Sequence, residues 1–217
     1  MHKKMIITMF TLLGLLLICS PFLKGGIIAC LSKSQNASAL TVEQLKKNNE
    51  KEAAFEFDSI EPPDLMDTIK AGFDHDQKAI IGRITIKSVD LELPILKGTT
   101  NENLLIGTAT MRPDQRMGEG NYPLAGHHLK QKSLLFGPLE NIKTGAQIVI
   151  TDFTKDYIYS VTFKKIISEM DIDVIEDTNE KEITLITCDK AVKTEGRLVV
   201  KGKLVDSFGH TKLNTDK

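Results

Sequence analysis

The sequence predicts an all-β domain, a sandwich or a barrel, behind a membrane-spanning helix and a linker. Short runs of alternating apolar and polar residues recur through 79–206, few helix signals accompany them, and a long uncharged stretch stands near the N-terminus. We divide the chain into an anchor, a linker, a folded domain and a polar tail, at residues 1–24, 25–64, 65–206 and 207–217.

The N-terminal anchor is predicted from length and charge. Lys3 and Lys4 precede residues 5–23, which contain no charged side chain. A helix needs roughly 20 mostly apolar residues to cross a bilayer. The basic pair should stay in the cytoplasm. We therefore expect a single-pass protein of the cell membrane, with its N-terminus inside and the folded domain outside.

Two alternatives to a retained anchor are a cleaved signal peptide and a lipoprotein. Pro21 and the small residues near Ala29 are compatible with cleavage, but the apolar run exceeds the usual length of about 7–15 residues. The run "IIAC" resembles a lipidation box ending at Cys30, although Lys24 separates it from the apolar core. The sequence favours the uncleaved anchor.

The linker contains one helix signal. Thr41 stands three residues before Gln44, the spacing of a capping box, and Glu43 falls in the first turn. Pro62 and Pro63 end any helix that begins there.

The folded domain begins with two predicted hairpins. "AIIGRITIKSVDLELPILKG" alternates on both sides of a turn at 88–90, and "AQIVITDFTKDYIYSVTFKKII" does so around a turn at 154–156. The run "KQKSLLFGPLENIKTG" is typical of a loop with one helical turn. Two more strands, "EITLITC" and "GRLVVKGKLVD", follow it.

Composition excludes one class of partner. The net charge is −1, so nothing indicates a surface that binds nucleic acid. Hydrophobic residues make up 41% of the chain, which is enough for an ordinary core.

Cys188 is the candidate nucleophile. The other two cysteines, Cys19 and Cys30, lie in or beside the N-terminal hydrophobic segment, so Cys188 lacks an evident disulfide partner. It ends a strand, on the same face as Thr184 and Ile186. A buried, inert thiol is the ordinary alternative, but a strand end is a place where a sheet presents a side chain to a site.

A thiol nucleophile needs a base, and two adjacent histidines are the candidates. Neighbouring residues of a strand point to opposite faces, so we expect one of His127 and His128 to face Cys188 and the other to face away. Gly126 would let the backbone approach closely there. No cluster with zinc-like spacing accompanies them, and we expect no metal. The remaining histidines stand in polar or terminal segments: His2, His75 and His210.

Arg197 opens the strand that follows Cys188. If the two strands are neighbours, the loop 189–196 folds back and brings Arg197 near the thiol. A guanidinium could there stabilise a thiolate or an oxyanion. A Cys–His–Arg site suits acyl transfer.

These residues resemble the sortase family, and most closely its class A, the housekeeping sortases of Gram-positive bacteria. "TLITC" at 184–188, "LAGHH" at 124–128 and "RLVVKG" at 197–202 match the segments that hold the family's cysteine, histidine and arginine. The resemblance covers about residues 75–206. It implies an eight-stranded β-barrel with short helices.

The resemblance also implies an activity. Sortases cleave Leu-Pro-x-Thr-Gly (LPXTG) sorting signals of surface proteins between Thr and Gly, and join them to an amine of the lipid-linked peptidoglycan precursor. Cys188 would form a thioacyl intermediate, His127 would act as general acid and then base, and Arg197 would stabilise charge. Three residues fall where the family lines its substrate groove: Thr187, Ile186 and Ala125.

One departure from the family concerns calcium. Some class A members bind it through acidic residues upstream of the histidine, where this chain has Arg112 and Gln115. Asp114, Glu119 and Asn121 do not restore a set of oxygen ligands. We therefore expect no cofactor and no calcium requirement.

Other readings stay open. L,D-transpeptidases place a Ser-His-Gly-Cys run at the nucleophile, and papain-like hydrolases place the cysteine first, at the start of a helix; neither pattern is present. A pilin-polymerising or other-class sortase is the main alternative. A membrane-tethered binding module with an inert thiol is the non-enzymatic one.

Overall fold

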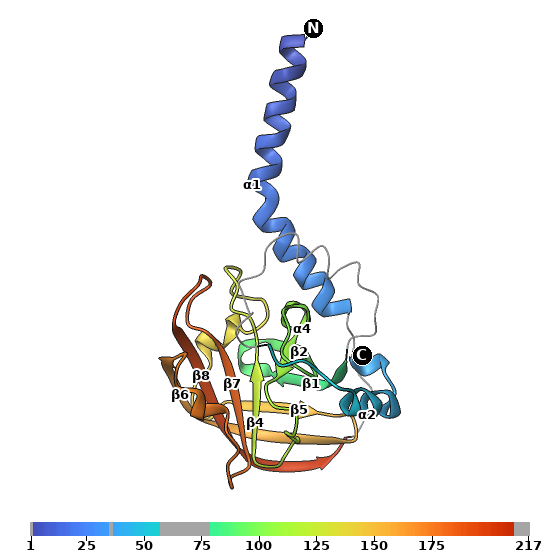
Figure 1. Ribbon diagram of the computed structural model, residues 1–217, viewed down its shortest axis with the longest axis vertical. Helices are drawn as coiled ribbons and strands as arrows, with labels where there is room; N and C mark the ends of the chain where they lie inside the picture. The colour runs from blue at the N-terminus through green and yellow to red at the C-terminus, as the bar shows by residue number, and fades with distance from the viewer. Residues whose placement is uncertain (1, 35–36, 57–78, 211–217) are drawn as a thin grey trace.

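The computed structural model describes residues 2–34, 37–56 and 79–210 (Figure 1). The predicted proline break at 62–63 and His75 lie outside these residues.

The described residues contain eight strands that close into a barrel, in the order β1-β2-β3-β4-β7-β8-β6-β5. Neighbouring strands are antiparallel except for the β2–β3 and β4–β7 pairs. The predicted β-barrel with short helices is thereby confirmed. The strands are β1 Ile80–Ile86, β2 Leu91–Leu96, β3 Thr108–Thr110, β4 Asn121–Ala125, β5 Gln147–Thr151, β6 Lys155–Ser168, β7 Glu182–Cys188 and β8 Gly196–Gly209.

The two predicted hairpins are present. The β1–β2 turn contains the short 3-10 helix η3 (Lys87–Val89) and a left-handed Asp90, as expected. The predicted position of the β5–β6 turn is wrong by two residues, because β6 already begins at Lys155. Asp152 causes the earlier turn: its Oδ1 accepts hydrogen bonds from the backbone N–H groups of Thr154 and Lys155.

Short helices cover parts of the barrel. The predicted capping box is confirmed, with Thr41 and Gln44 bonded reciprocally at the start of α2 (Val42–Glu50). This helix packs on β1, and its buried Asn48 donates to the carbonyl of Ile80. The other short helices are η1 (Ala37–Ala39), α4 (Asn101–Ile106), η4 (Gly137–Asn141) and η5 (Ile172–Ile175).

The N-terminal helix α1 (His2–Ser34) extends away from the barrel and meets it only at its C-terminal end (Figure 1). Ile28, near that end, is fully buried in the main core. Within the described part of the chain, no helix has both the length and the apolar character that crossing a membrane requires.

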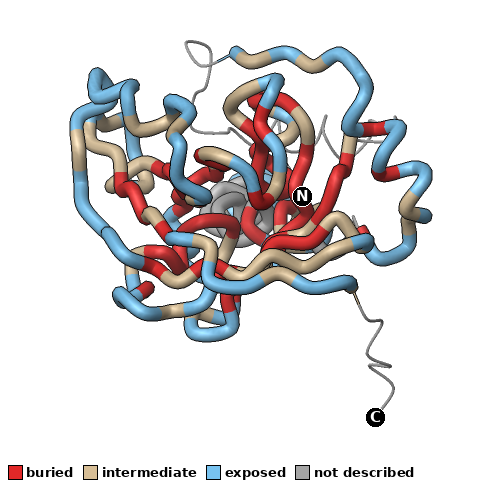
Figure 2. Tube along the Cα trace, turned by 90° about the horizontal axis from the view of Figure 1, so that it is seen from below, coloured by how far each residue is buried: buried red, intermediate tan, exposed pale blue. Residues whose placement is uncertain are grey.

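The core fills the barrel interior, and exposed residues form its rim (Figure 2). Strand β7 is buried on both faces: Ile183 and Leu185 belong to the core cluster, and Thr184 and Ile186 on the other face are buried as well. The final strand β8 runs to Gly209, three residues past the domain boundary at 206 drawn from the sequence. The sheet therefore includes the first part of the expected polar tail.

Candidate active site

The parallel pairing of β4 with β7 brings His127 level with Cys188. Ala125 is the register partner of Ile186, and the Gly126 N–H donates to the Ile186 carbonyl at 3.1 Å. His127 and Cys188 each lie two residues after this pair, in the same direction along the two parallel chains. Both residues therefore lie at the same end of two neighbouring strands.

The antiparallel β7–β8 hairpin brings Arg197 to the same end. Cys188 and Arg197 are direct register partners, and the Asp189 N–H bonds the Gly196 carbonyl at 3.1 Å. Opposed residues of an antiparallel pair place their side chains on the same face. The condition set in the sequence analysis, that these two strands are neighbours, is met.

The Cys188 thiol is free and half-buried. Burial raises its pKa above the ordinary thiol value, because a thiolate is poorly solvated there. The positive charge of Arg197 lowers the pKa, whereas the carboxylates of Asp189 and Glu169 raise it. In this arrangement the thiol is mostly protonated at neutral pH.

Glu169, directly after β6, holds the Arg197 guanidinium. Its Oε2 lies 2.6 Å from one terminal nitrogen, and the other donates to the carbonyls of Thr194 at 2.7 Å and Gly196 at 3.0 Å. We did not identify Glu169 from the sequence. The only signal is the register of β6 on β8, which pairs Ser168 with Gly196 and is not visible in the chain itself.

We expect Glu169→Gln to lower the pKa of the Cys188 thiol, because it removes a nearby negative charge and one partner of Arg197. The measurement is the rate of iodoacetamide alkylation of Cys188 against pH, whose midpoint should move to lower pH. Glu176→Gln, an exposed glutamate elsewhere, should leave the midpoint unchanged. A midpoint that moves upward in Glu169→Gln would contradict the assignment.

Gly126 provides close backbone packing beside His127, as predicted. A Cβ at this position would lie 2.6 Å from two ring atoms of the fully buried Phe136. The Phe136 N–H in turn donates to the His127 carbonyl at 3.0 Å. The aromatic ring and this hydrogen bond thus fix the backbone that presents His127, whose side chain is buried.

Gly126→Ala should lower the free energy of unfolding by about 1–3 kcal/mol and reduce activity, because the Phe136 ring or the His127 backbone must move. Thermal melts and peptide turnover measure the two effects. Adding Phe136→Leu should restore part of both, since it removes the clashing ring. Gly209→Ala, where a Cβ meets nothing, is the matched control. Wild-type stability of Gly126→Ala would refute the packing argument.

His128 departs from the prediction that one histidine faces away. Its Nδ1 lies 2.8 Å from the Cys188 carbonyl oxygen, and its Nε2 lies 3.1 Å from Glu140 Oε1. The residue follows β4, where it forms an isolated bridge with Leu135 rather than continuing the strand. The alternation of a strand therefore does not apply, and both histidines lie at the end of β7.

The three predicted groove residues do not all share one face. Ile186 lies on the Cys188 face of β7 with 8% of its surface exposed, and Ala125 is half-buried at the end of β4. Thr187 lies on the opposite face, with Ile183 and Leu185, and is 3% exposed. Its hydroxyl has no hydrogen-bond partner among the described residues.

Comparison with known proteins places this geometry in a family. The family model described as "Sortase domain" matches residues 84–205. The chain belongs to the sortase family. Sortases are cysteine transpeptidases, so this protein is an enzyme rather than a binding module. The family also excludes the L,D-transpeptidases and the papain-like hydrolases. It is a sortase A-like enzyme that anchors surface proteins.

Three relatives show how far the similarity extends. Sortase A of Listeria monocytogenes is 46% identical over 204 residues, which cover 94% of this chain and 92% of that protein. The putative sortase YwpE of Bacillus subtilis is 89% identical over 101 residues, covering 46% of this sortase and 99% of YwpE. The crystal structure of the Listeria sortase A gives a TM-score of 0.61 at 48% identity, covering 61% of this chain and 92% of that chain.

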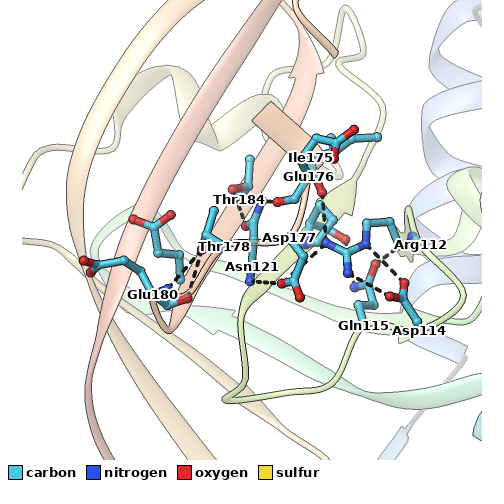
Figure 3. Close-up of polar contacts among 12 residues, drawn as sticks. Arg112, Asp114, Gln115, Asn121, Ile175, Glu176, Asp177, Thr178, Glu180 and Thr184 are labelled. Atoms are coloured by element: carbon cyan, nitrogen blue, oxygen red, sulfur yellow. Dashed lines mark hydrogen bonds and ion pairs between the residues drawn. The ribbon is translucent and has the colours of Figure 1, made fainter. Parts of the chain in front are cut away.

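In this sortase the segment upstream of β4 contains an ion-pair cluster. Figure 3 shows Arg112 between Asp114, at 3.0 Å, and Asp177 of the β6–β7 connection, at 3.6 Å. Arg112 lowers the pKa of Asp114 mainly by hydrogen bonding, and a backbone hydrogen bond from Asn121 lowers that of Asp177. Both carboxylates are therefore ionised and already face a cation.

The carboxylates of this cluster already pair with a side-chain cation. The Arg112 guanidinium would repel a second cation at the same carboxylates. Asn121 donates from its amide nitrogen to two backbone carbonyls, and its oxygen accepts from the Thr184 hydroxyl at 2.7 Å. The oxygen ligands that calcium needs are thus already engaged.

Proposed function

We propose that this sortase cleaves Leu-Pro-x-Thr-Gly sorting signals between Thr and Gly and transfers the threonyl carbonyl to an amine of the peptidoglycan precursor. The placement of Cys188, His127 and Arg197 at one end of three adjoining chain segments supports this proposal. Acyl transfer needs a nucleophile, a proton carrier and a stabiliser of negative charge within one site.

In the first step the Cys188 thiolate attacks the threonyl carbonyl carbon and an S–C bond forms. The C–N bond to glycine then breaks, and protonated His127 gives its proton to the leaving amine. In the second step the acceptor amine attacks the thioester, His127 takes a proton from it, and the thiolate leaves. The Cys188 thiolate and the protonated His127 are thereby restored.

Arg197 would stabilise the oxyanion that forms on the carbonyl oxygen in each step. A guanidinium has five N–H donors. Its contacts with Glu169, Thr194 and Gly196 use three of them in the described residues, which leaves two for a substrate oxygen.

Ile186 and Ala125 would contact the sorting signal, since they adjoin the nucleophile and retain exposure. Thr187 would support the groove without contacting the sorting signal, because its side chain faces the barrel interior. The uncharged stretch 5–23 would hold the enzyme in the cell membrane, with its N-terminus inside and the barrel outside. That location gives access to secreted surface proteins and to a lipid-linked acceptor.

The test is to incubate the full-length chain in detergent with a Leu-Pro-x-Thr-Gly peptide and a small amine, and to analyse the products by mass spectrometry. We expect the threonyl–amine product, and an acyl adduct on Cys188 when the amine is omitted. A peptide with Thr and Gly exchanged is the matched control. Absence of both product and adduct would refute the proposal.

We also propose that activity needs no calcium, because Arg112 already pairs with Asp114 and Asp177. Peptide turnover should change by less than about twofold between excess chelator and millimolar calcium. The variant Arg112→Gln, which removes the cation, provides the comparison. A severalfold activation of the unmodified enzyme by calcium would contradict this proposal.

A further inference from the structure

The side chain of His128 lies between two groups that can only accept hydrogen bonds. Its Nδ1 is 2.8 Å from the carbonyl oxygen of Cys188, and its Nε2 is 3.1 Å from Oε1 of Glu140. The side chain is 3% exposed, so water does not compete for either nitrogen. A backbone carbonyl has no proton to give, so Nδ1 must be the donor of the first hydrogen bond.

The second hydrogen bond depends on the charge of Glu140. A hydrogen bond from Lys132, at 2.8 Å from its other carboxylate oxygen, lowers the pKa of Glu140, and the positive charges of Lys132 and Lys164 lower it further. Glu140 is therefore ionised and has no proton to give. A ring with a proton on each nitrogen would satisfy both acceptors, whereas a neutral ring has a single N–H to donate.

The group that His128 holds belongs to the nucleophile itself. β7 ends at Cys188, and its carbonyl begins the turn that leads to β8. Fixing this carbonyl fixes the peptide plane that follows Cys188, and with it the backbone from which the thiol projects. A charge-assisted hydrogen bond is shorter and roughly twice as strong as a neutral one.

We propose that His128, held as an imidazolium by Glu140, is a positioning residue that orients the Cys188 backbone for attack on the substrate carbonyl. The inference rests on the proposed role of Cys188 as nucleophile. It gives the two adjacent histidines separate tasks: His127 exchanges protons with the reacting groups, while His128 keeps its protons and acts through the backbone.

The protonation state is tested first, by NMR of the full-length chain in detergent with 15N-labelled histidine. At pH 7.5 the His128 ring, assigned with the variant His128→Asn, should show two protonated nitrogens. In Glu140→Gln the ring should be neutral, because the glutamine amide can donate to Nε2. A neutral His128 ring in the wild-type protein would overturn the proposal.

The positioning role is tested by kinetics. We expect His128→Ala to lower kcat for the sorting-signal peptide by about 10- to 100-fold with KM nearly unchanged. Alkylation of Cys188 by iodoacetamide should stay within about twofold, because a small reagent does not require an oriented thiol. His128→Asn retains a donor for the Cys188 carbonyl and should recover part of kcat. Lys143→Met, which removes an exposed lysine outside the contacts of His128 and Glu140, is the control.

Three results would count against the role. An unchanged kcat in His128→Ala would show that His128 does not position Cys188. Alkylation that falls in step with kcat would indicate general disruption of the site, as would a large drop in melting temperature in both His128→Ala and His128→Asn. If the wild-type chain cleaves no peptide although Cys188 alkylates, the proposed substrate fails, and the NMR result still decides the state of His128.

Discussion

Cys188→Ala is expected to abolish transpeptidation, with a loss of about 10⁴-fold or more. The loss is large because the reaction loses its covalent step rather than one stabilising contact. The half-buried side chain loses only its sulfur, so the barrel should keep its melting temperature within a few degrees. Product formation and the acyl adduct, both followed by mass spectrometry, measure the effect.

Cys30→Ala is the matched control, since Cys30 is a free thiol exposed on α1. It should retain wild-type turnover and the adduct at Cys188. Residual turnover above about 1% in Cys188→Ala, or an adduct that disappears in Cys30→Ala, would show that the nucleophile is misassigned.

Asn121→Ala should lower the free energy of unfolding by about 3 kcal/mol. The buried amide donates to the carbonyls of Val174 and Glu176, each at 2.9 Å, and accepts from the Thr184 hydroxyl. Each of these three hydrogen bonds contributes about 1 kcal/mol, and the Thr184 hydroxyl would be left buried without a partner. Urea unfolding followed by circular dichroism measures the change.

Asn141→Ala removes an exposed asparagine and should change stability by less than about 0.5 kcal/mol. The β6–β7 connection should also open in Asn121→Ala, because two of its carbonyls lose their donor. Faster hydrogen exchange around residues 174–177 would record this opening. Equal stabilities of the two variants would show that the Asn121 network contributes nothing net.

Alternating sequence predicts the long strands well because one face of each is buried in the barrel. The run that forms β7 shows this: Ile183 and Leu185 enter the core, whereas Cys188 ends the opposite face. The β7–β8 pairing was only a condition in the sequence analysis, although a seven-residue connection is short enough to return the chain beside itself.

Among the elements that the sequence analysis did not predict, β3, β4 and α4 have weak local signals. β3 has three residues, too few to show a period. β4 contains Pro123, which argues against a central strand because it lacks an N–H donor. Helix α4 is short, although Thr100, whose hydroxyl accepts from the Asn103 N–H, offered a capping signal.

Some residues of the candidate site could be predicted from the sequence and others could not. Cys188, His127 and Arg197 stand in recognisable runs of sequence. Glu169 and Glu140 do not, because each reaches the site through an ion pair that forms only once the barrel has closed: Glu169 with Arg197 across β6 and β8, and Glu140 with His128 across a loop. Surface glutamates give no sign of such partners in advance.

The raised pKa of the Cys188 thiol has a consequence for the lifetime of the enzyme. Peroxides and disulfides react with thiolates, and a thiol that is mostly protonated is attacked slowly. Burial thus protects the Cys188 thiol from oxidation to sulfenic acid and beyond. The same burial leaves few molecules in the reactive form at any moment. The shielding of this sulfur thus lowers both its reactivity toward substrate and its reactivity toward oxidants.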